Sequence, residues 1–176
     1  MPSRSRTFHY LCHMNRIKQA ILFLVPCLFY LAACSSADLY EKSVSIPGHA
    51  WKSGYKPGFK FIIKDTSAPY ELFLILRHND KYSFNNIYIN LSVKTPGSDS
   101  ATVMRCDLRL ANDNNGWLAS GMDDIFEHRI KLTPWLVDNN ISLRRQGEYE
   151  FGVQQIMRED PLANVLDVGL RVEKKQ

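Results

Sequence analysis

The chain has 176 residues, of which 45% are hydrophobic and 23% charged, so it holds enough apolar side chains for one packed domain. Its 22 basic and 18 acidic residues give a net charge of +4, but residues 1–33 contain four of the basic residues and no acidic residue. The rest of the chain is formally neutral. This argues against a nucleic-acid-binding protein, which would carry excess positive charge on its folded part.

The N-terminal segment has the three-part layout of a secretory signal peptide. Arg16 and Lys18 form a short cationic region, and residues 20–31 form an apolar core that is followed by small residues. A transmembrane helix would need about 20 apolar residues, and this run is shorter. Met14 is a more economical start than the first methionine, and we expect residues 1–33 to be removed as the signal peptide.

The tetrad Leu31-Ala32-Ala33-Cys34 resembles the lipobox of bacterial lipoproteins. In such proteins the cysteine thiol receives a diacylglyceryl group and becomes the first residue after cleavage, and two or more acyl chains give stable membrane anchoring. We therefore expect Cys34 to be lipidated and residues 34–45 to form the lipidated N-terminus and a tether. An ordinary secretion signal with an incidental cysteine is the alternative. Cys106 then remains alone, without a disulfide, and is expected to be a small buried residue.

The remaining sequence reads as short alternating strands separated by turn residues. The windows that alternate are 59–64, 70–77, 87–93, 102–110, 116–120, 125–132, 149–156 and 166–173. The fourth window places Met104, Cys106, Leu108 and Leu110 inward, and the last places Leu166, Val168, Leu170 and Val172 inward. No window has an apolar stripe of helical period and length. The pattern predicts an all-β protein with a single antiparallel β-sandwich over residues 46–176, for which a jelly roll is one arrangement, and it leaves the strand order open.

The sequence contains no motif of a known catalytic or metal site. It lacks the HExxH and CxxC patterns, the GxSxG elbow, the P-loop and the dinucleotide fingerprint. The histidines of the expected domain, His49, His78 and His128, lie far apart in the sequence. We therefore predict no metal site, no cofactor and no enzymatic activity.

Three tryptophans, Trp51, Trp117 and Trp135, support an alternative function. Aromatic side chains stack on sugars in many β-sandwich modules, so a lipid-anchored glycan-binding module is the alternative function. Packing in or around the core is the other interpretation of these residues. In addition, Asp99-Ser100-Ala101 resembles the sites at which Bacteroidetes O-glycosylate exported proteins, which makes Ser100 a candidate for modification.

The C-terminal strand carries a charged pattern that is typical of a surface. Asp167 and Arg171 lie four residues apart and share one strand face, and Arg158 lies in the preceding turn. Exposed ion pairs of this kind contribute little to stability. The functional interpretation is a docking surface for a neighbouring envelope protein, on which charges set orientation and specificity. We treat Arg158, Asp167 and Arg171 as candidate docking residues.

The order of these elements resembles the gliding-motility lipoprotein GldH family of Bacteroidetes. The similarity runs through Ile46-Pro47, Trp51, residues 59–66, residues 70–79, Tyr82, residues 86–88, residues 116–118, Gly121, residues 147–151, residues 155–158, Leu162 and residues 167–173. The resemblance implies a lipid-anchored envelope protein that supports gliding motility or the linked secretion machinery, with other proteins of that machinery as partners. It brings no catalytic residues. We expect the protein at the outer membrane with its domain facing the periplasm.

Overall fold

The computed structural model describes residues 39–112 and 116–175. These residues belong to one compact unit, Asp38–Gln176. The expected signal peptide and Cys34 lie outside the described residues.

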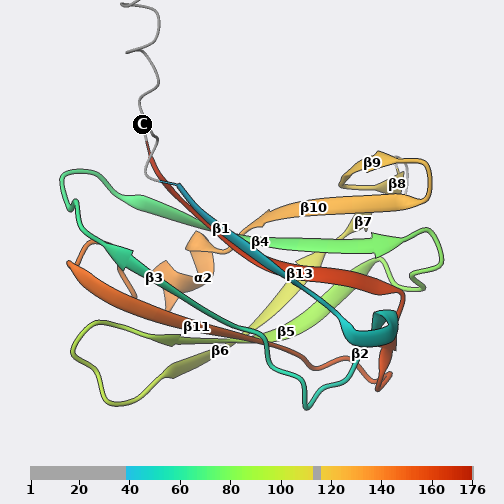
Figure 1. The fold of residues 1–176 in the computed structure, drawn as a ribbon, viewed down its shortest axis with the longest axis horizontal. Coiled ribbons are helices and arrows are strands. Elements are labelled where there is room, and N and C mark those ends of the chain that lie inside the picture. Colours follow the sequence, from blue (N-terminus) through green and yellow to red (C-terminus); the bar gives the residue numbers. More distant parts are fainter. Residues whose placement is uncertain (1–38, 113–115, 176) are drawn as a thin grey trace, which may run out of the picture. The chain divides into compact units, whose positions relative to one another are not determined.

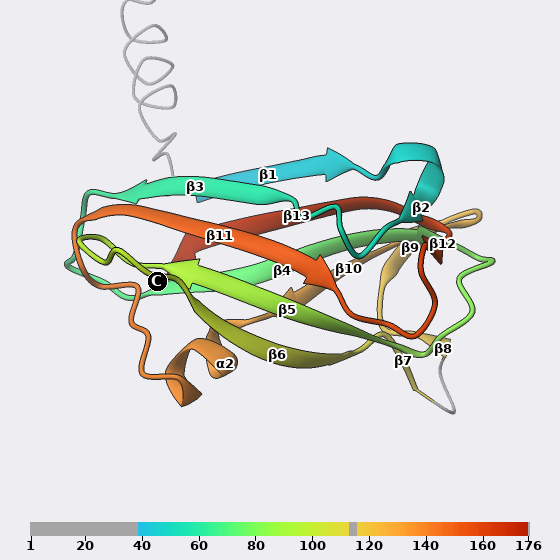
Figure 2. The ribbon, with the colours of Figure 1, turned by 90° about the horizontal axis from the view of Figure 1, so that it is seen from below.

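Eight long strands form two facing antiparallel sheets (Figures 1 and 2). The strands are β1 (Leu39–Ser45), β3 (Gly58–Ile63), β4 (Tyr70–Asn79), β5 (Asn86–Lys94), β6 (Thr102–Arg109), β10 (Ile125–Lys131), β11 (Gly147–Gln155) and β13 (Val165–Lys174). The five-stranded sheet has the order β1-β13-β4-β10-β9, in which β9 (Ser120–Met122) is a short edge strand, and the four-stranded sheet has the order β3-β11-β5-β6.

This strand order is that of a jelly roll. When the eight long strands are numbered along the chain, one sheet reads 1-8-3-6 and the other 2-7-4-5. Every connection except that between strands 4 and 5 crosses from one sheet to the other, which is the double Greek key of a jelly roll. The all-β sandwich expected from the alternation is confirmed.

Alternating burial explains why these segments form strands. Every second side chain of β5 is buried, and β4 contributes Leu72, Leu74 and Leu76 with no exposed surface. Met104, Cys106, Leu108 and Leu110 are all buried as predicted. The apolar faces of both sheets meet in one core, whose burial is the main favourable free-energy term in folding.

Short elements close the two ends of the sandwich. Strand β2 (Ala50–Trp51) pairs with β12 (Leu162–Ala163), and β7 (Ala111–Asn112) pairs with β8 (Gly116–Trp117). A 3-10 turn, η1 (Pro47–His49), precedes β2, and a six-residue helix, α2 (Thr133–Asp138), follows β10. Such a short helix cannot display a sustained apolar stripe, and the sequence pattern did not indicate it.

The structure differs from the sequence-based expectation at two strands. Residues 39–45, expected to be part of a tether, form β1, which pairs with β13 along its whole length. Among residues 40–45 of this edge strand, Tyr40 and Val44 pack on the core, so the alternation of these residues is weak. In β13 a register shift between Val165 and Asp167 buries Val165 and leaves Leu166 partly exposed, so Leu166 is not the inward residue predicted.

Candidate functional site

The outer face of the five-stranded sheet carries the side chains that alternate away from the core. Strand register places Ser45, Asp167, Arg77, Glu127 and Ser120 in one row across the sheet. A second row holds Ser43, Gly169, Ile75 and Arg129, and a third holds Glu41, Arg171, Phe73 and Lys131. We call this surface the outer face. The predicted docking residues Asp167 and Arg171 both lie on it, in the two rows that flank the middle one.

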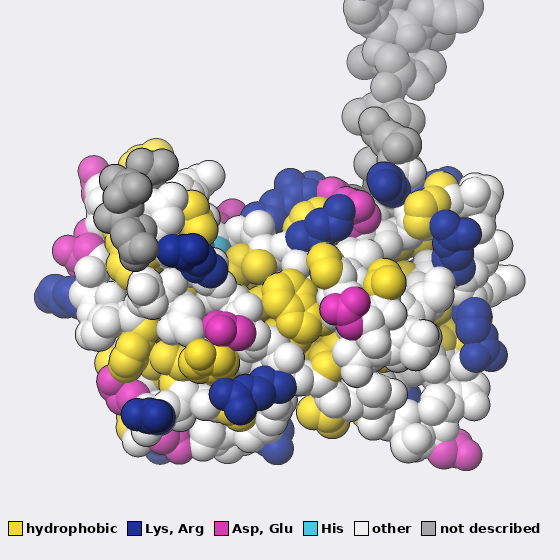
Figure 3. Space-filling model, turned by 180° about the vertical axis from the view of Figure 1, so that it is seen from behind, with side chains coloured by type: hydrophobic (Ala, Val, Ile, Leu, Met, Phe, Trp, Pro, Cys, Tyr) yellow, Lys and Arg dark blue, Asp and Glu magenta, His cyan; other side chains and the backbone are white. Residues whose placement is uncertain are grey.

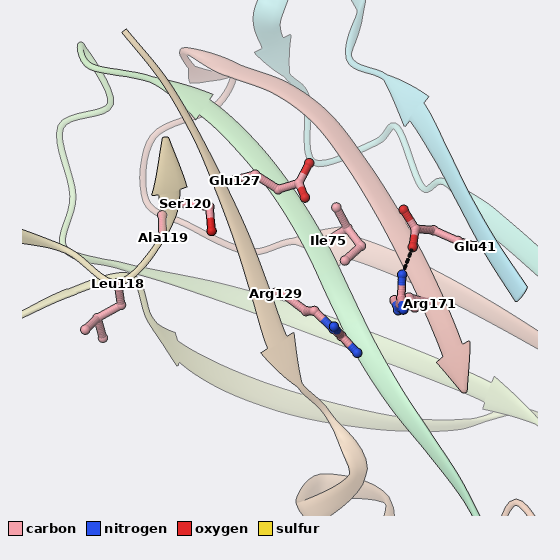
Figure 4. Close-up of a pocket in the computed structure, with 8 residues that line it drawn as sticks. All are labelled: Glu41, Ile75, Leu118, Ala119, Ser120, Glu127, Arg129 and Arg171. Carbon is pink, nitrogen blue, oxygen red and sulfur yellow. Dashed lines mark hydrogen bonds and ion pairs between the residues drawn. The ribbon is translucent and has the colours of Figure 1, made fainter. Parts of the chain in front are cut away.

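A hollow of about 570 Å³ lies over the middle row of the outer face (Figure 4). Its lining consists of Glu41, Ile75, Leu118, Ala119, Ser120, Glu127, Arg129 and Arg171. Ile75 belongs to the floor and is only 4% exposed, although it points away from the core. Gly169 of β13, which pairs with Ile75, has no side chain of its own, and this keeps the middle row low. The hollow therefore combines an apolar floor with charged walls.

Ion pairs fix the side chains on one wall of the hollow. Arg171 donates to Glu41 from Nη1 over 2.6 Å and to Glu173 from Nε over 3.1 Å. Arg129 donates to the same Glu173 over 2.5 Å, and its guanidinium lies 4.4 Å from the centre of the Phe73 ring. The hydrogen bond to Glu41 raises the pKa of Arg171, so this side chain stays charged at all physiological pH values. The network holds both arginines in defined positions.

A second network crosses the sheet at the row of Asp167. Ser45 donates to Asp167 over 2.7 Å, and Arg77 lies 3.8 Å from the same carboxylate. Arg77 also donates to Glu127 from Nε over 2.5 Å, and this contact raises the pKa of Arg77. All these groups are at least partly exposed, so their net contribution to stability is small, in the range of about 0–1 kcal/mol for each pair. Their fixed positions and signs instead define a pattern that a partner can recognise.

The other wall of the hollow belongs to a flap, which we define as residues 116–122. Leu118 donates its backbone N–H to the carbonyl oxygen of Leu110 over 2.7 Å, and Nδ1 of His128 lies 3.2 Å from the carbonyl oxygen of Leu118. The Trp117 ring packs against His78 at a centroid distance of 4.4 Å. The flap exposes Leu118 and Met122, and the adjacent Ile125 is exposed as well. Of these side chains, Leu118 lines the hollow and gives that wall an apolar part.

His78 and His128 form a buried pair beneath the flap. Both are 0% exposed, their Nε2 atoms lie 2.8 Å apart, and Nδ1 of His78 lies 2.7 Å from the carbonyl oxygen of Asn79. Burial lowers the pKa of both imidazoles, and the neighbouring His78 lowers the pKa of His128 further, to about 4. Both imidazoles are neutral at pH 7, so each has one N–H group, and these two N–H groups can serve only two of the three ring contacts. The contact between Nδ1 of His128 and the carbonyl oxygen of Leu118 is the longest, and we expect Nδ1 of His128 to carry no proton.

The other predicted site residues lie elsewhere in the domain. Arg158 is exposed between β11 and β12 and takes no part in the ion pairs of Asp167 and Arg171. Ser100 is exposed in the loop between β5 and β6 and remains a predicted modification site. Cys34 lies outside the described residues. Cys106 is buried and unpaired, as expected, and burial raises the pKa of its thiol to about 12.

The three tryptophans do not form a shared stacking surface. Trp51 is 0% exposed and donates from Nε1 to the carbonyl oxygen of Tyr55 over 2.8 Å, so its faces are covered by the core. Trp117 packs on the histidine pair, and Trp135 on α2 is partly buried against the core. Among the aromatic contacts of the described residues, none joins two tryptophans. The geometry therefore does not favour the glycan-binding alternative.

The hollow and several residues that line it were not predicted from the sequence. Glu41 belongs to the segment that was expected to be a tether. Ile75 and Leu118 lie in predicted strands, where their apolar side chains gave no sign of a binding surface. The histidine pair was also missed, because 50 residues separate its members and only the pairing of β10 with β4 joins them. In the described part of the chain, three or more His, Cys, Asp or Glu residues nowhere gather in a way that could hold a metal ion. The helices found in that same part are too short or too polar to span a membrane.

Comparison with known proteins points to one family. The sequence pattern of the GldH lipoprotein family matches residues 38–172. The chain is 26% identical over 167 residues to the gliding motility lipoprotein GldH of Flavobacterium johnsoniae, covering 91% of this chain and 99% of that protein. It is 24% identical over 163 residues to a gliding motility lipoprotein GldH homolog of Christiangramia forsetii, covering 88% of this chain and 95% of that protein.

Solved structures resemble this chain only weakly. A structure of infectious bursal disease virus, Gt strain, aligns with a TM-score of 0.31 and 15% identity, over 79% of this chain and 33% of the viral chain. The VP2 subviral particle of that virus aligns with a TM-score of 0.29 and 17% identity, over 77% of this chain and 30% of the other. The chain thus spans about a third of the viral proteins, and these similarities carry no argument about function.

Proposed function

Because the chain belongs to the GldH lipoprotein family, we propose that it is a lipid-anchored, non-enzymatic component of the cell envelope that supports gliding motility or a linked protein-secretion machinery. The family match over residues 38–172 and the full-length similarity to two gliding motility lipoproteins support this proposal. In this function the β-sandwich recognises another protein of the machinery, and the lipid holds it at the membrane.

The anchor of the proposed function is Cys34, with the domain at the outer membrane and facing the periplasm. The tetrad that ends at Cys34 supports this assignment, since it has the small residues that a lipoprotein signal peptide needs before its cysteine. Metabolic labelling with a palmitate analogue tests the anchor. The native protein should be labelled, Cys34→Ser should not, and Cys106→Ser should be labelled like the native protein. Equal labelling of the native protein and Cys34→Ser would contradict lipidation at this residue. Protease digestion of intact and lysed cells tests the orientation.

The outer face is the proposed docking surface. The observation that carries this proposal is the hollow, in which the apolar floor at Ile75 lies between two fixed networks of ion pairs that contain Arg171 and Asp167. Apolar contact surrounded by ordered charges is the arrangement in which a protein partner gains both affinity and orientation. We therefore assign the outer face to a partner protein of the envelope that carries complementary charges and an apolar contact.

Charge reversal on the outer face tests this assignment. We expect Arg171→Glu to fold and to lose crosslinked co-purification with gliding or secretion proteins from whole envelopes, identified by mass spectrometry. Lys56→Glu is the matched control, because Lys56 is exposed in a loop away from the outer face and the charge change is the same. A folded Arg171→Glu protein that captures the same partners as the control would contradict docking on this surface.

A further inference from the structure

One end of the sandwich gathers the loops that adjoin the start of β1. Leu39 pairs with Glu173, Lys174 pairs with Tyr70, Ile63 pairs with Gly147 and Val93 pairs with Thr102. These registers place residues 64–69, 95–101, 132–146 and 174–175 at the same end, which is the left end in Figures 1 and 2. We call these four segments the anchor end, because β1, the first described strand after Cys34 in the sequence, begins there.

Basic side chains predominate at the anchor end. Its five basic residues are Lys64, Arg144, Arg145, Lys174 and Lys175, and its three acidic residues are Asp65, Asp99 and Asp138. Lys174 forms an ion pair with Asp65, while the other four basic side chains are exposed and form no ion pair among the described residues. In Figure 3, which turns this end to the right, several Lys and Arg side chains lie along that edge.

The opposite end of the sandwich has the reverse balance. Its described loops, residues 46–57, 80–85, 110–112, 118–119, 123–124 and 156–161, contain four basic and five acidic residues. The basic residues are Lys52, Lys56, Lys81 and Arg158, and the acidic residues are Asp80, Asp123, Asp124, Glu159 and Asp160. Positive charge therefore predominates in the loops at one end of the domain and negative charge in the loops at the other, although residues 34–176 have a net charge of zero.

The anchor end also presents apolar surface. Helix α2 exposes 65% of Val137, and the neighbouring Trp135 is only partly buried. Tryptophan is enriched at membrane–water interfaces, where its ring fits between the headgroups and the acyl chains. An exposed valine and a half-buried tryptophan, at the same end as four cations without an ion pair, are features of a surface that contacts lipid headgroups.

The length of the linker limits where this end can lie. Five peptide steps separate Cys34 from Leu39, and a fully extended chain of that length spans at most about 18 Å. A lipid on Cys34 therefore keeps the start of β1 within that distance of the headgroups. We propose that the anchor end lies against an anionic lipid surface, with Lys64, Arg144, Arg145 and Lys175 facing the lipid headgroups. This inference rests on the proposed lipid anchor and adds a second contact to it.

The contact gives the lipid anchor an orienting role. A single flexible attachment would let the domain rotate freely, whereas a basic end on an anionic surface selects one set of orientations. The acidic end then points away from the membrane, and the outer face stands at its side, open to a partner. Each basic side chain near such a surface contributes on the order of a fivefold change in the population of the contact state at low ionic strength.

Fluorescent probes at the two ends test the contact on the mature lipidated protein. Ser142→Cys places a probe at the anchor end and Ser83→Cys places one at the opposite end, and both serines are exposed while Cys106 is buried. The two proteins are reconstituted into vesicles of phosphatidylcholine, with or without 30% phosphatidylglycerol, that contain lipids with a quencher on the headgroup. We expect strong quenching at position 142 only with phosphatidylglycerol, and its loss in high salt. Quenching at position 83 should be weak throughout.

Matched charge reversals at each end complete the experiment. Arg144→Glu with Arg145→Glu should reduce the quenching at position 142 at least fivefold, while Lys52→Glu with Lys56→Glu, the same charge change at the opposite end, should leave it unchanged. Equal quenching of both probes, or equal effects of both double variants, would overturn the proposed contact while leaving the lipid anchor intact. Failure of the protein to co-float with any vesicle would instead contradict the anchor and with it the proposed function.

Discussion

His78 and His128 face each other inside the core, with their Nε2 atoms 2.8 Å apart and no exposed surface on either side chain. Through Nδ1, His128 reaches the carbonyl oxygen of Leu118 at 3.2 Å, in the flap that forms one wall of the hollow. The pair therefore lies between the core and the candidate docking surface. Its protonation is expected to affect both the stability of the domain and the position of the flap.

We predict that acidification destabilises the domain between pH 6.5 and 4. Burial lowers the pKa of His128 from 6.5 to about 4 in the folded protein, so in this range the unfolded chain binds more protons than the folded one. The stabilising contribution is complete above pH 6.5 and is lost as the pH falls through about 4. Its size is on the order of 3 kcal/mol. Urea unfolding at pH 7.0, 5.5 and 4.5 measures the loss.

The variant His128→Gln supplies the control for this prediction. Glutamine cannot titrate, so the free energy of unfolding of the variant should depend less steeply on pH over the same range, even if its value at pH 7 is lower. A native protein whose stability is constant from pH 7.0 to 4.5, or a variant with the native slope, would contradict the assignment to this pair.

Gly169 permits the close approach of β1 to β13. A Cβ atom at this position would lie 2.1 Å from Oγ of Ser43 and 2.7 Å from the backbone oxygen of Lys42. We predict that Gly169→Ala destabilises the domain by about 1–3 kcal/mol, because β1 must shift to relieve the overlap. Gly58→Ala is the control, since its Cβ would meet only the oxygen of Phe151 at 3.8 Å. Thermal unfolding of the two variants should differ clearly, and equal melting temperatures would show that β1 adapts freely.

Trp51 supports the end of the sandwich from within the core. Because it is fully buried and pairs with Leu162 through β2 and β12, Trp51→Ala should destabilise the domain by about 3–5 kcal/mol. Trp135→Ala removes a partly buried ring and should cost less. Chemical denaturation compares the two. If Trp51→Ala kept native stability and reduced binding in a glycan array, the glycan-binding alternative would gain the support that the structure does not give it.

We predict that replacing Arg171 weakens partner binding much more than it lowers the stability of the domain. Its ion pairs with Glu41 and Glu173 are partly exposed, so Arg171→Ala should reduce the free energy of unfolding by no more than about 1 kcal/mol. We expect the same variant to weaken partner capture strongly, because the guanidinium lines the hollow. Parallel measurement of unfolding and of co-purification distinguishes the two effects. A large loss of stability together with unchanged capture would make Arg171 a structural residue only.

The sequence alone predicted the sandwich because its strands alternate strongly. In β5 and β6 every inward position is apolar, and the pattern identifies both strands almost to the residue. Strand β1 lies at the edge of its sheet, where, among residues 40–45, Tyr40 and Val44 are the side chains that pack on the core. Its sequence therefore alternates too weakly for the strand to be predicted. The bulge at Val165 was missed for a different reason: a register shift depends on the pairing partner β4, which local periodicity does not describe.

The candidate site was predictable in part. Asp167 and Arg171 could be placed on one strand face from their spacing, and the structure puts both on the outer face. Arg158 could not be placed, because a turn has no fixed direction. The hollow over Ile75 and the contact between the flap and His128 arise from β4, β10 and β13 lying side by side. Such long-range packing is not encoded in any one segment of the sequence.

Site-specific photo-crosslinking in cell envelopes tests whether a partner protein docks on the outer face. A photoreactive amino acid in place of Ser120 lies at the hollow, and one in place of Val103 lies on the exposed side of the other sheet, where that side chain is 60% exposed. We expect a crosslink from position 120 to a protein of the gliding or secretion machinery, its loss when Arg171→Glu is added, and no such product from position 103. Crosslinks that arise equally from both positions, or only from position 103, would contradict docking on the outer face.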